Sequence, residues 1–398
     1  MEYRLCKTKE GELTKNPWEV NLPDDFKDNV AFHKELLRFA KFIKDKANEG
    51  RMYISLGDVF RNRCEYKKAI ENHELALGIA RDLKDKVEEA YACGSLGDDF
   101  QKVCAFNKAI EYHNIALRIS IDLKDKAGEA KACRGLGHAF RALYDHKQAI
   151  EYYKRCLSVA KELGDKALEG DACSGLGYAF HEQSHYTIAE KYHNQHLNIA
   201  KSLKDKSGEQ MAYTSLGSVF GRLGDFKKSL DHFKCAVNIA KELGDKEALM
   251  LAYGGLGKAF EHLGNLRKAE EYTNLRLNLS KEIGNKCEEG SAYCNLGDIF
   301  SRLGNFKKSI ECFNRQLKIA KEIEDLMAEG AALGGLGVVL TASENSKKPL
   351  TTTRNIFVLL KPLKIKMGKE LHMEILATLI SALKISRTPY IADRKSVV

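Results

Sequence analysis

Residues 131–140, KACRGLGHAF, contain the Leu-Gly pair that decides the fold. The pair recurs at a constant spacing along the chain, and a phenylalanine follows the glycine by three positions in the first seven of eight copies. The leucines of these copies are Leu56, Leu96, Leu136, Leu176, Leu216, Leu256, Leu296 and Leu336. A strict period of this length is typical of repeat arrays. The sequence therefore predicts a stack of similar units.

The same stretch raises the alternative of a phosphate-binding loop, because Gly135 and Gly137 form a Gly-x-Gly. The third glycine of a Gly-x-Gly-x-x-Gly motif would fall at Phe140, and no run of β-branched residues precedes the pair. A position inside a helix explains the stretch better. We expect Gly137 to face a closely packed partner helix and Gly135 to lie on the groove side of its own helix.

Each unit is predicted to hold two antiparallel helices. Residues 47–63 place Tyr53, Leu56 and Phe60 on one face, and we name this segment helix A. Residues 66–83 place apolar side chains at alternating steps of four and three, and we name this segment helix B. Gly-Asp and Gly-Asn turns in the later copies suit the left-handed end of a helix. The aspartates of the LKDK and LGDK linkers are expected to cap the following helix A.

Composition supports a helical protein inside the cell. The 398 residues are 44% hydrophobic and include only 5 prolines, which favours helices. The N-terminus has no signal-peptide pattern, and no uncharged apolar stretch is long enough to span a membrane, so we expect a cytoplasmic location. The 11 cysteines include no Cys-x-x-Cys pair. Cys93, Cys133 and Cys173 are spaced by one repeat length each and are expected to be small packing residues.

The net charge of +9 is unevenly distributed. Residues 341–398 contain 11 Lys plus Arg and 4 Asp plus Glu, a net of +7, which leaves a net of +2 for the first 340 residues. A nearly neutral array is not an electrostatic trap for nucleic acid. The basic C-terminal tail is interpreted as a solvated end of the chain, with contact to a membrane or RNA as the alternative.

The repeat resembles a known family. A bulky residue, Leu-Gly, an aromatic residue, and later Ala, an aromatic residue and Ala form the pattern of the tetratricopeptide repeat. The matching residues are Tyr53, Leu56, Gly57, Phe60, Ala69, His73 and Ala76. The length of the unit, with its extended helix B, is similar to that of the Pins/LGN spindle-orientation adaptors and the tetratricopeptide repeat protein 28 family. The resemblance implies an all-α fold, a right-handed superhelical α-solenoid of antiparallel helix pairs.

Three regions are predicted along the chain. Residues 1–23 form an N-terminal tail, and residues 24–344 form the repeat array. The array begins with a lone helix B at 26–44, continues with seven full repeats at 47–324, and ends with a partial eighth repeat. Residues 345–398 are expected to contain degenerate helices, a cap for the array and the basic tail.

Two features of this last region support that interpretation. Pro349 and Pro362 interrupt the eighth helix B, since a proline inside a helix costs about 3 kcal/mol. The amphipathic stretch 369–385 is expected to cap the array, with docking on a partner as the alternative. The chain does not end in the Asp-Gln-Arg of segments that bind G-protein α subunits in the Pins/LGN group.

Nothing in the sequence predicts catalysis. Neither a Ser/His/Asp set nor a His-Glu-x-x-His motif occurs, and we expect no enzyme activity, cofactor, metal site or small-molecule substrate. The repeated histidines His33, His73, His113 and His193 share one position on helix B and are interpreted as packing residues.

The predicted function is a protein-interaction scaffold whose concave groove binds a peptide segment, acidic in character, of a partner protein. In the resemblance the unpacked face of helix A forms the groove. The third repeat places Lys131, Arg134, His138 and Arg141 on one stripe of that face. Such cations suit carboxylates, although the arginines could instead pair with Asp98 or Asp171 of neighbouring repeats. The candidate site is completed by Tyr178, His181, Arg61 and Lys102.

Other functions stay open at this point. One is a G-protein-signalling or spindle-orientation adaptor of the Pins/LGN kind. Another is a helical repeat that binds nucleic acid, and a third is a regulatory fragment of a larger protein. The sequence identifies neither the partner nor the oligomeric state.

Overall fold

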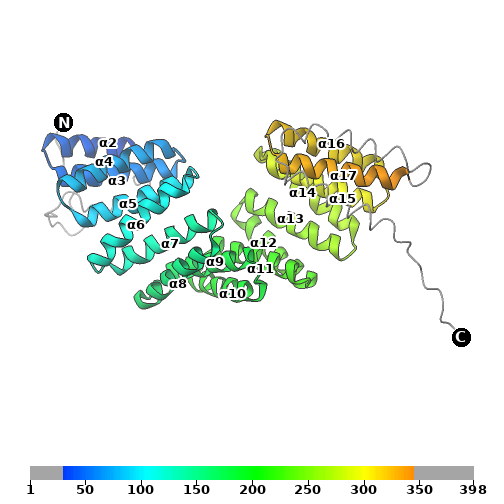
Figure 1. The fold of residues 1–398 in the computed structure, drawn as a ribbon, viewed down its shortest axis with the longest axis horizontal. Coiled ribbons are helices and arrows are strands. Elements are labelled where there is room, and N and C mark those ends of the chain that lie inside the picture. Colours follow the sequence, from blue (N-terminus) through cyan, green and yellow to red (C-terminus); the bar gives the residue numbers. More distant parts are fainter. Residues whose placement is uncertain (1–29, 345–398) are drawn as a thin grey trace. The chain divides into compact units, whose positions relative to one another are not determined.

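A computed structural model describes residues 30–344, and this part of the chain consists of helices joined by short turns (Figure 1). The prediction of an all-α fold is confirmed. The helices A are α3 (Lys46–Asn62), α5 (Lys86–Lys102), α7 (Lys126–Ala142), α9 (Lys166–Glu182), α11 (Lys206–Leu223), α13 (Lys246–His262), α15 (Lys286–Arg302) and α17 (Leu326–Glu344). The helices B are α2 (Val30–Phe42), α4 (Tyr66–Asp82), α6 (Phe106–Asp122), α8 (His146–Leu163), α10 (Tyr186–Leu203), α12 (Phe226–Leu243), α14 (Leu266–Ile283) and α16 (Phe306–Glu322).

The predicted helix positions agree with these bounds to within two residues where the structure describes them. The lone helix B predicted at 26–44 corresponds to α2. The predicted tail at 1–23, the degenerate helices, the cap at 369–385 and the basic C-terminal tail lie outside the described residues. None of the described helices is both long enough and apolar enough to cross a membrane.

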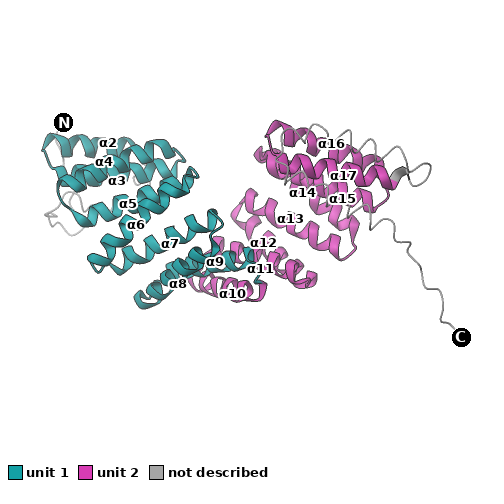
Figure 2. Cartoon of the chain, in the orientation of Figure 1, with its two compact units in different colours: residues 1–185 teal, residues 186–398 magenta. Residues whose placement is uncertain are grey.

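The chain divides into two compact units, residues 1–185 and 186–398 (Figure 2). The boundary falls inside the fourth repeat, because α9 belongs to the first unit and α10 to the second. Within each unit consecutive helices pack on one another as antiparallel pairs. Neighbouring helices A also touch, with α3, α5, α7 and α9 in sequence in the first unit. Helices A therefore share one wall of that unit.

Aspartate and asparagine side chains begin most of the helices. Asp85 caps α5, where its carboxylate accepts hydrogen bonds from the backbone amides of Val87 and Glu88 at 3.1 Å. Asp125, Asp165, Asp205 and Asp245 cap later helices A in the same way. The capping predicted from the linker sequences is confirmed.

The turns between helices use the left-handed backbone region. Gly224 and Gly304, in the predicted Gly-Asp and Gly-Asn turns, have φ of 81° and 73°. Non-glycine residues occupy the same conformation at most turns of the first unit: Lys44, Cys64, Lys84, Cys104, Lys124, Tyr144 and Ser184. Among the described residues of the second unit, only Lys204 and Glu324 do so. The same turn is thus built from less suitable residues in the first unit.

The Leu-Gly glycine makes room for the ring of helix B in the same repeat. A Cβ atom on Gly137 would lie 2.6 Å from the ring of Tyr153, and one on Gly297 would lie 2.7 Å from the ring of Phe313. The close approach expected at Gly137 is confirmed. Gly135 does not lie on the groove side as expected. It is buried, and a Cβ there would lie 2.4 Å from the ring of His113, which belongs to helix B of the preceding repeat.

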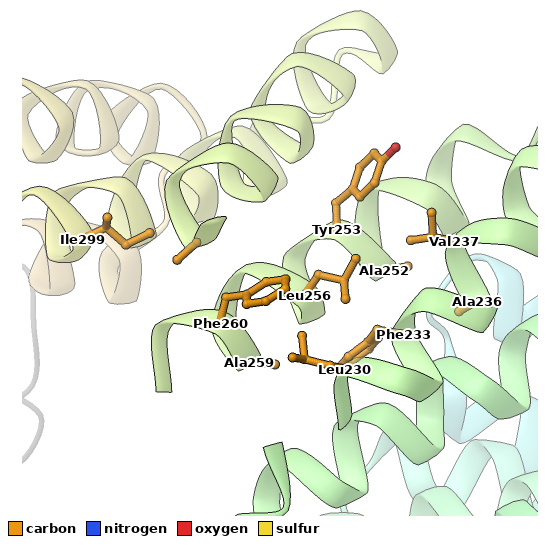
Figure 3. Close-up of a cluster of buried hydrophobic side chains, with 11 residues drawn as sticks. Leu230, Phe233, Ala236, Val237, Ala252, Tyr253, Leu256, Ala259, Phe260 and Ile299 are labelled. Atoms are coloured by element: carbon orange, nitrogen blue, oxygen red, sulfur yellow. The ribbon is translucent and has the colours of Figure 1, made fainter. Parts of the chain in front are cut away.

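Apolar side chains from neighbouring helices form the core between them. In the second unit, Leu230 and Phe233 of α12 gather with Leu256 and Phe260 of α13 (Figure 3). The Phe260 ring also stacks on Tyr272 of α14, with ring centroids 5.5 Å apart. Each repeat thus buries its apolar face only by contact with its neighbours.

The repeated cysteines are core residues, as predicted. Cys93, Cys133 and Cys173 are at most 1% exposed. Burial raises the pKa of each thiol to about 11, so these cysteines stay protonated near neutral pH. A protonated, buried thiol acts as a small apolar packing group.

Candidate functional site

All eight candidate residues belong to helices A of the first unit. Arg61 lies on α3, Lys102 on α5, and Tyr178 and His181 on α9. The other four, Lys131, Arg134, His138 and Arg141, follow one stripe along α7. Since α5, α7 and α9 touch in sequence, the stripe lies in the middle of the shared wall.

Two arginines of the stripe pair with carboxylates of the next repeat. Nη1 of Arg134 lies 2.9 Å from Oδ2 of Asp171, and Nη1 of Arg141 lies 2.7 Å from Oε1 of Glu182. The side chains of Arg134 and Asp171 are 32% and 52% exposed, and those of Arg141 and Glu182 are 30% and 31% exposed. Ion pairs with this much solvent contact contribute at most about 1 kcal/mol each. Another carboxylate can therefore replace Asp171 or Glu182 at low cost.

The two lysines of the candidate site have no such partner. Lys131 and Lys102 are exposed, and neither makes an ion pair with a residue between 30 and 344. Tyr178 adds an aromatic surface beside Arg141, whose guanidinium carbon lies 5.4 Å from the ring centroid. His181 is half-buried on the same helix.

His138 contacts the side chain of Tyr153, on helix B of the same repeat. Its Nδ1 lies 2.9 Å from the hydroxyl oxygen of Tyr153 on α8, a fully buried residue. The positive charge of Arg141 also acts on this hydroxyl. Burial raises the pKa of Tyr153 despite the nearby arginine, so the phenol keeps its proton.

The pKa of His138 is lowered to about 4. Burial is the main cause, and the charges of Arg134 and Arg141 add to it, followed by His113 and Lys102. His138 is therefore neutral at physiological pH. The stripe thus presents three permanent cations and one neutral imidazole.

Arg61 occupies a different environment from the arginines of α7. Its Nε lies 2.6 Å from Oδ1 of the fully buried Asp99, and its Nη2 lies 2.8 Å from Oδ1 of Asp58. Asp99 also accepts a hydrogen bond from Nδ1 of the buried His73. Burial disfavours the charged form of His73, but its bonds to Asp58 and Asp99 outweigh this and raise its pKa. Arg61 is therefore fixed by internal carboxylates.

His113 lies one repeat further along and has no buried carboxylate beside it. Its Nε2 lies 2.9 Å from Nε2 of Gln101, and Asp98 is the nearest carboxylate, at 3.7 Å. Burial lowers the pKa of His113, and Arg134 adds to the effect against the opposing charge of Asp98. The prediction that the repeated histidines are packing residues is confirmed for His73 and His113, which are 0% and 2% exposed.

The wall of helices A in the second unit has a different character. Met211 and Leu251, at the repeat position of Lys131, are exposed apolar side chains. Asp298 stands at the repeat position of His138. Desolvation and then the charge of Glu261 raise its pKa to about 6, although the side chain keeps some solvent contact. Arg302 pairs with Glu261 at 2.8 Å. A row of cations like that on α7 does not recur on the described helices of this unit.

The sequence did not predict three residues that contact the candidate residues. Glu182 pairs with Arg141, Tyr153 contacts His138, and Asp99 pairs with Arg61. Asp99 left a signal, because the other repeats have Val, Ala or Ile at its position. Asp171, one of the two internal partners that the sequence offers to the arginines, pairs with Arg134. Within residues 30–344, no group of three or more His, Cys, Asp or Glu side chains could hold a metal ion.

The repeats match models of a known family. A tetratricopeptide repeat model matches residues 88–162, 128–202 and 209–282, and a second tetratricopeptide repeat model matches residues 290–323. The chain is a tetratricopeptide repeat protein. No curated protein matches this tetratricopeptide repeat protein in sequence.

Solved structures share the fold of this tetratricopeptide repeat protein at low sequence identity. A signal transduction ATPase with a tetratricopeptide repeat sensor, from Pyrococcus horikoshii, is 17% identical with a TM-score of 0.64, over 92% of this chain and 55% of that one. The apo form of the quorum sensor NprR from B. thuringiensis is 15% identical with a TM-score of 0.61, over 74% and 84% of the two chains.

A Rap protein complexed with Competence and Sporulation Factor is also similar. It is 16% identical with a TM-score of 0.58, over 85% of this chain and 93% of that one. At these identities the likeness shows the fold alone.

Proposed function

We propose that this protein is a non-catalytic interaction scaffold whose first unit binds an acidic peptide segment of a partner protein along α7. The observation that carries the proposal is the stripe of Lys131, Arg134, His138 and Arg141 on the shared wall of helices A. Lys102 adds a cation from α5, and Tyr178 adds an aromatic surface from α9. Arginine binds carboxylates through two parallel hydrogen bonds, which suits Asp and Glu side chains of an extended peptide.

The internal ion pairs make the site exchangeable. Asp171 and Glu182 occupy the arginines in the free protein, and both remain in contact with solvent. A peptide carboxylate that replaces either one releases an ion pair of small net value. The two unpaired lysines then supply attraction that no internal carboxylate offsets. Micromolar affinity requires about 8 kcal/mol, which a few charge-assisted contacts with aromatic anchors can provide.

One similar structure supports the use of the fold for binding. The Rap protein is in complex with Competence and Sporulation Factor. We extend only the general idea of a bound partner to this chain, and the acidic character of the ligand rests on α7 itself. The family models match the repeat alone, so a Pins/LGN-like adaptor role and a cytoplasmic location remain hypotheses.

Charge reversal on the stripe tests the proposal. The variant with Lys131, Arg134 and Arg141 all changed to Glu is compared with wild type for binding of fluorescent peptide pools of acidic, neutral and basic composition. We expect wild type to prefer the acidic pool, and the variant to bind that pool at least tenfold more weakly. The matched control changes Lys67, Lys147 and Lys154 to Glu, three exposed lysines on helices B. It alters the net charge equally and is expected to bind like wild type.

Two results would contradict the proposal. One is an equal loss of binding in both variants, because the effect would then follow net charge and not the stripe. The other is capture of RNA from lysate through the array in preference to protein, which would favour a nucleic-acid-binding repeat. A steep dependence of that capture on salt would identify phosphate contacts as its source.

A further inference from the structure

The imidazole of His138 on the stripe can donate a hydrogen bond to a ligand, which is a more specific contact than general charge attraction. The Tyr153 hydroxyl lies 2.9 Å from Nδ1 of His138, and the positive charge of Arg141 acts on the same hydroxyl. The positive charge of Arg141 attracts the lone pairs of the phenol oxygen and turns its proton away, toward Nδ1. Nδ1 of the neutral imidazole is then the acceptor, and Nε2 carries the proton. No residue between 30 and 344 makes a hydrogen bond to this Nε2.

The groups around His138 come from every helix packed on α7. Arg134 and Arg141 lie on α7 itself, Lys102 comes from α5 and His113 from α6, and all four disfavour a positive charge on the ring. The opposing groups do not face the ring directly. Asp171 and Glu182 of α9 are bound to the two arginines, and Asp98 of α5 acts on Arg134 and His113.

This arrangement lacks one component, an anion against the imidazole. We propose that Nε2 of His138 donates a hydrogen bond to a carboxylate of the bound peptide, and that at mildly acidic pH binding at α7 is accompanied by uptake of a proton by His138. The inference rests on the proposed function of the stripe. The proton comes from solvent and adds to Nδ1, while the Tyr153 hydroxyl turns to accept a hydrogen bond from the new N–H. His138 then changes from a neutral donor to an imidazolium paired with the ligand.

The expected size of the effect follows from charge balance. A carboxylate near the ring reverses the unfavourable field of the cations and raises the titration midpoint of His138 by about one to two pH units. A free midpoint of about 4 would thus move toward about 6 in the complex. Through linkage, the affinity for a carboxylate ligand rises by up to about tenfold between pH 8 and pH 5.

The experiment uses the full chain with isotope-labelled histidine and three probes: hexaglutamate, hexaglutamine and sodium malonate. His138→Gln identifies the His138 resonance, and it replaces the imidazole with a polar side chain that does not titrate. His232→Gln is the matched control, because His232 lies on α12 of the second unit, stacked on Phe220. We expect hexaglutamate to raise the His138 midpoint and hexaglutamine to leave it unchanged. The gain in hexaglutamate affinity at pH 5 should persist in His232→Gln and disappear in His138→Gln.

The outcomes separate this inference from the proposed function. If hexaglutamate binds wild type and His138→Gln with the same pH dependence, the His138 contact is wrong and the acidic groove still stands. The same conclusion follows if hexaglutamate binds with no change in the His138 midpoint. If neither hexaglutamate nor malonate binds wild type, both the groove and the His138 contact are wrong.

Discussion

The first and second repeats bury the same side chain, a histidine of helix B, with pKa shifts in opposite directions. His73 and His113 occupy one repeat position in successive units, and both are buried. Asp99 contacts His73, whereas the residue one period further on is Ala139. The pKa of His73 is consequently raised and that of His113 is lowered. Hydrogen bonds to Asp58 and Asp99 thus raise the pKa of one buried imidazole, while burial without a buried carboxylate lowers the pKa of the other.

The presence or absence of this buried aspartate also affects the arginines on the shared wall of helices A. Asp99 also holds Arg61, so the first repeat keeps its arginine in internal ion pairs. The counterpart of Asp99 for Arg141 is Ala179 of the fourth repeat, and the arginines of the third repeat reach exposed carboxylates of that repeat instead. Arg61 is thus paired with a buried carboxylate, whereas Arg134 and Arg141 are paired with carboxylates that keep solvent contact.

Removal of Asp99 should eliminate the difference between His73 and His113, with the largest expected effect on stability. Asp99→Ala gives the first pair of repeats the alanine of the next pair and leaves Arg61 and His73 without their buried carboxylate. Because an uncompensated buried charge is costly, we expect a loss of about 3 kcal/mol or more in the free energy of unfolding. Urea unfolding followed by circular dichroism measures it. Asp98→Ala, which removes a half-buried carboxylate, serves as the control and should cost about 1 kcal/mol or less. Equal losses would show that Asp99 is not the support of this network.

A methyl group at Gly135 should disturb the packing around His113 and leave that around His73 unchanged. The Cβ of Gly135→Ala would lie 2.4 Å from the His113 ring, so α6 and α7 must separate or the ring must turn. Overpacking of this kind costs about 1–3 kcal/mol. The matched control is Gly94→Ala, where a Cβ meets open space and helix propensity favours alanine by up to about 1 kcal/mol. Thermal or urea unfolding of the two variants should therefore shift in opposite directions. A neutral result at Gly135 would contradict the close contact.

The pH dependence of stability sharpens the comparison with a smaller effect. The folded pKa of His113 lies below its ordinary value of 6.5, so its contribution is fully present above pH 6.5 and is lost as pH falls toward the folded value. The folded pKa of His73 lies above 6.5, so its contribution is present below pH 6.5 and is lost as pH rises through the folded value.

Phenylalanine replaces histidine at the same position in two other repeats, at Phe233 and Phe313. His113→Phe should therefore remove the acid-sensitive contribution. We expect the variant to gain about 1 kcal/mol relative to wild type when the pH is lowered from 8 to 5. Urea unfolding at both pH values measures the difference. A difference that does not change with pH would mean that His113 keeps its ordinary pKa in the folded protein.

The repeat period and the apolar spacing within each unit were enough to predict the helices, and the aspartates of the linkers were enough to predict the caps of helices A. They were not enough to predict contacts that depend on how adjacent helices are rotated against each other. Gly135 was expected on the groove side, but the ring of His113 from the preceding repeat covers it. Asp99 and His73 are separated by 26 residues, and only the packing of α4 against α5 brings them together. The periodicity identifies a face, while side-chain partners follow from the packing of the next helix.

The left-handed turns have a consequence for the order in which the two units open. A non-glycine residue in this conformation costs roughly 1 kcal/mol more than glycine, and the first unit contains seven such turns. The stability of a repeat array is close to a sum of local terms, so this cost stays within the repeats that carry it. Backbone amides of α3 to α9 should accordingly exchange with solvent deuterium before those of α11 to α16. The part of the chain that carries the proposed site is then also the part that unfolds locally most often.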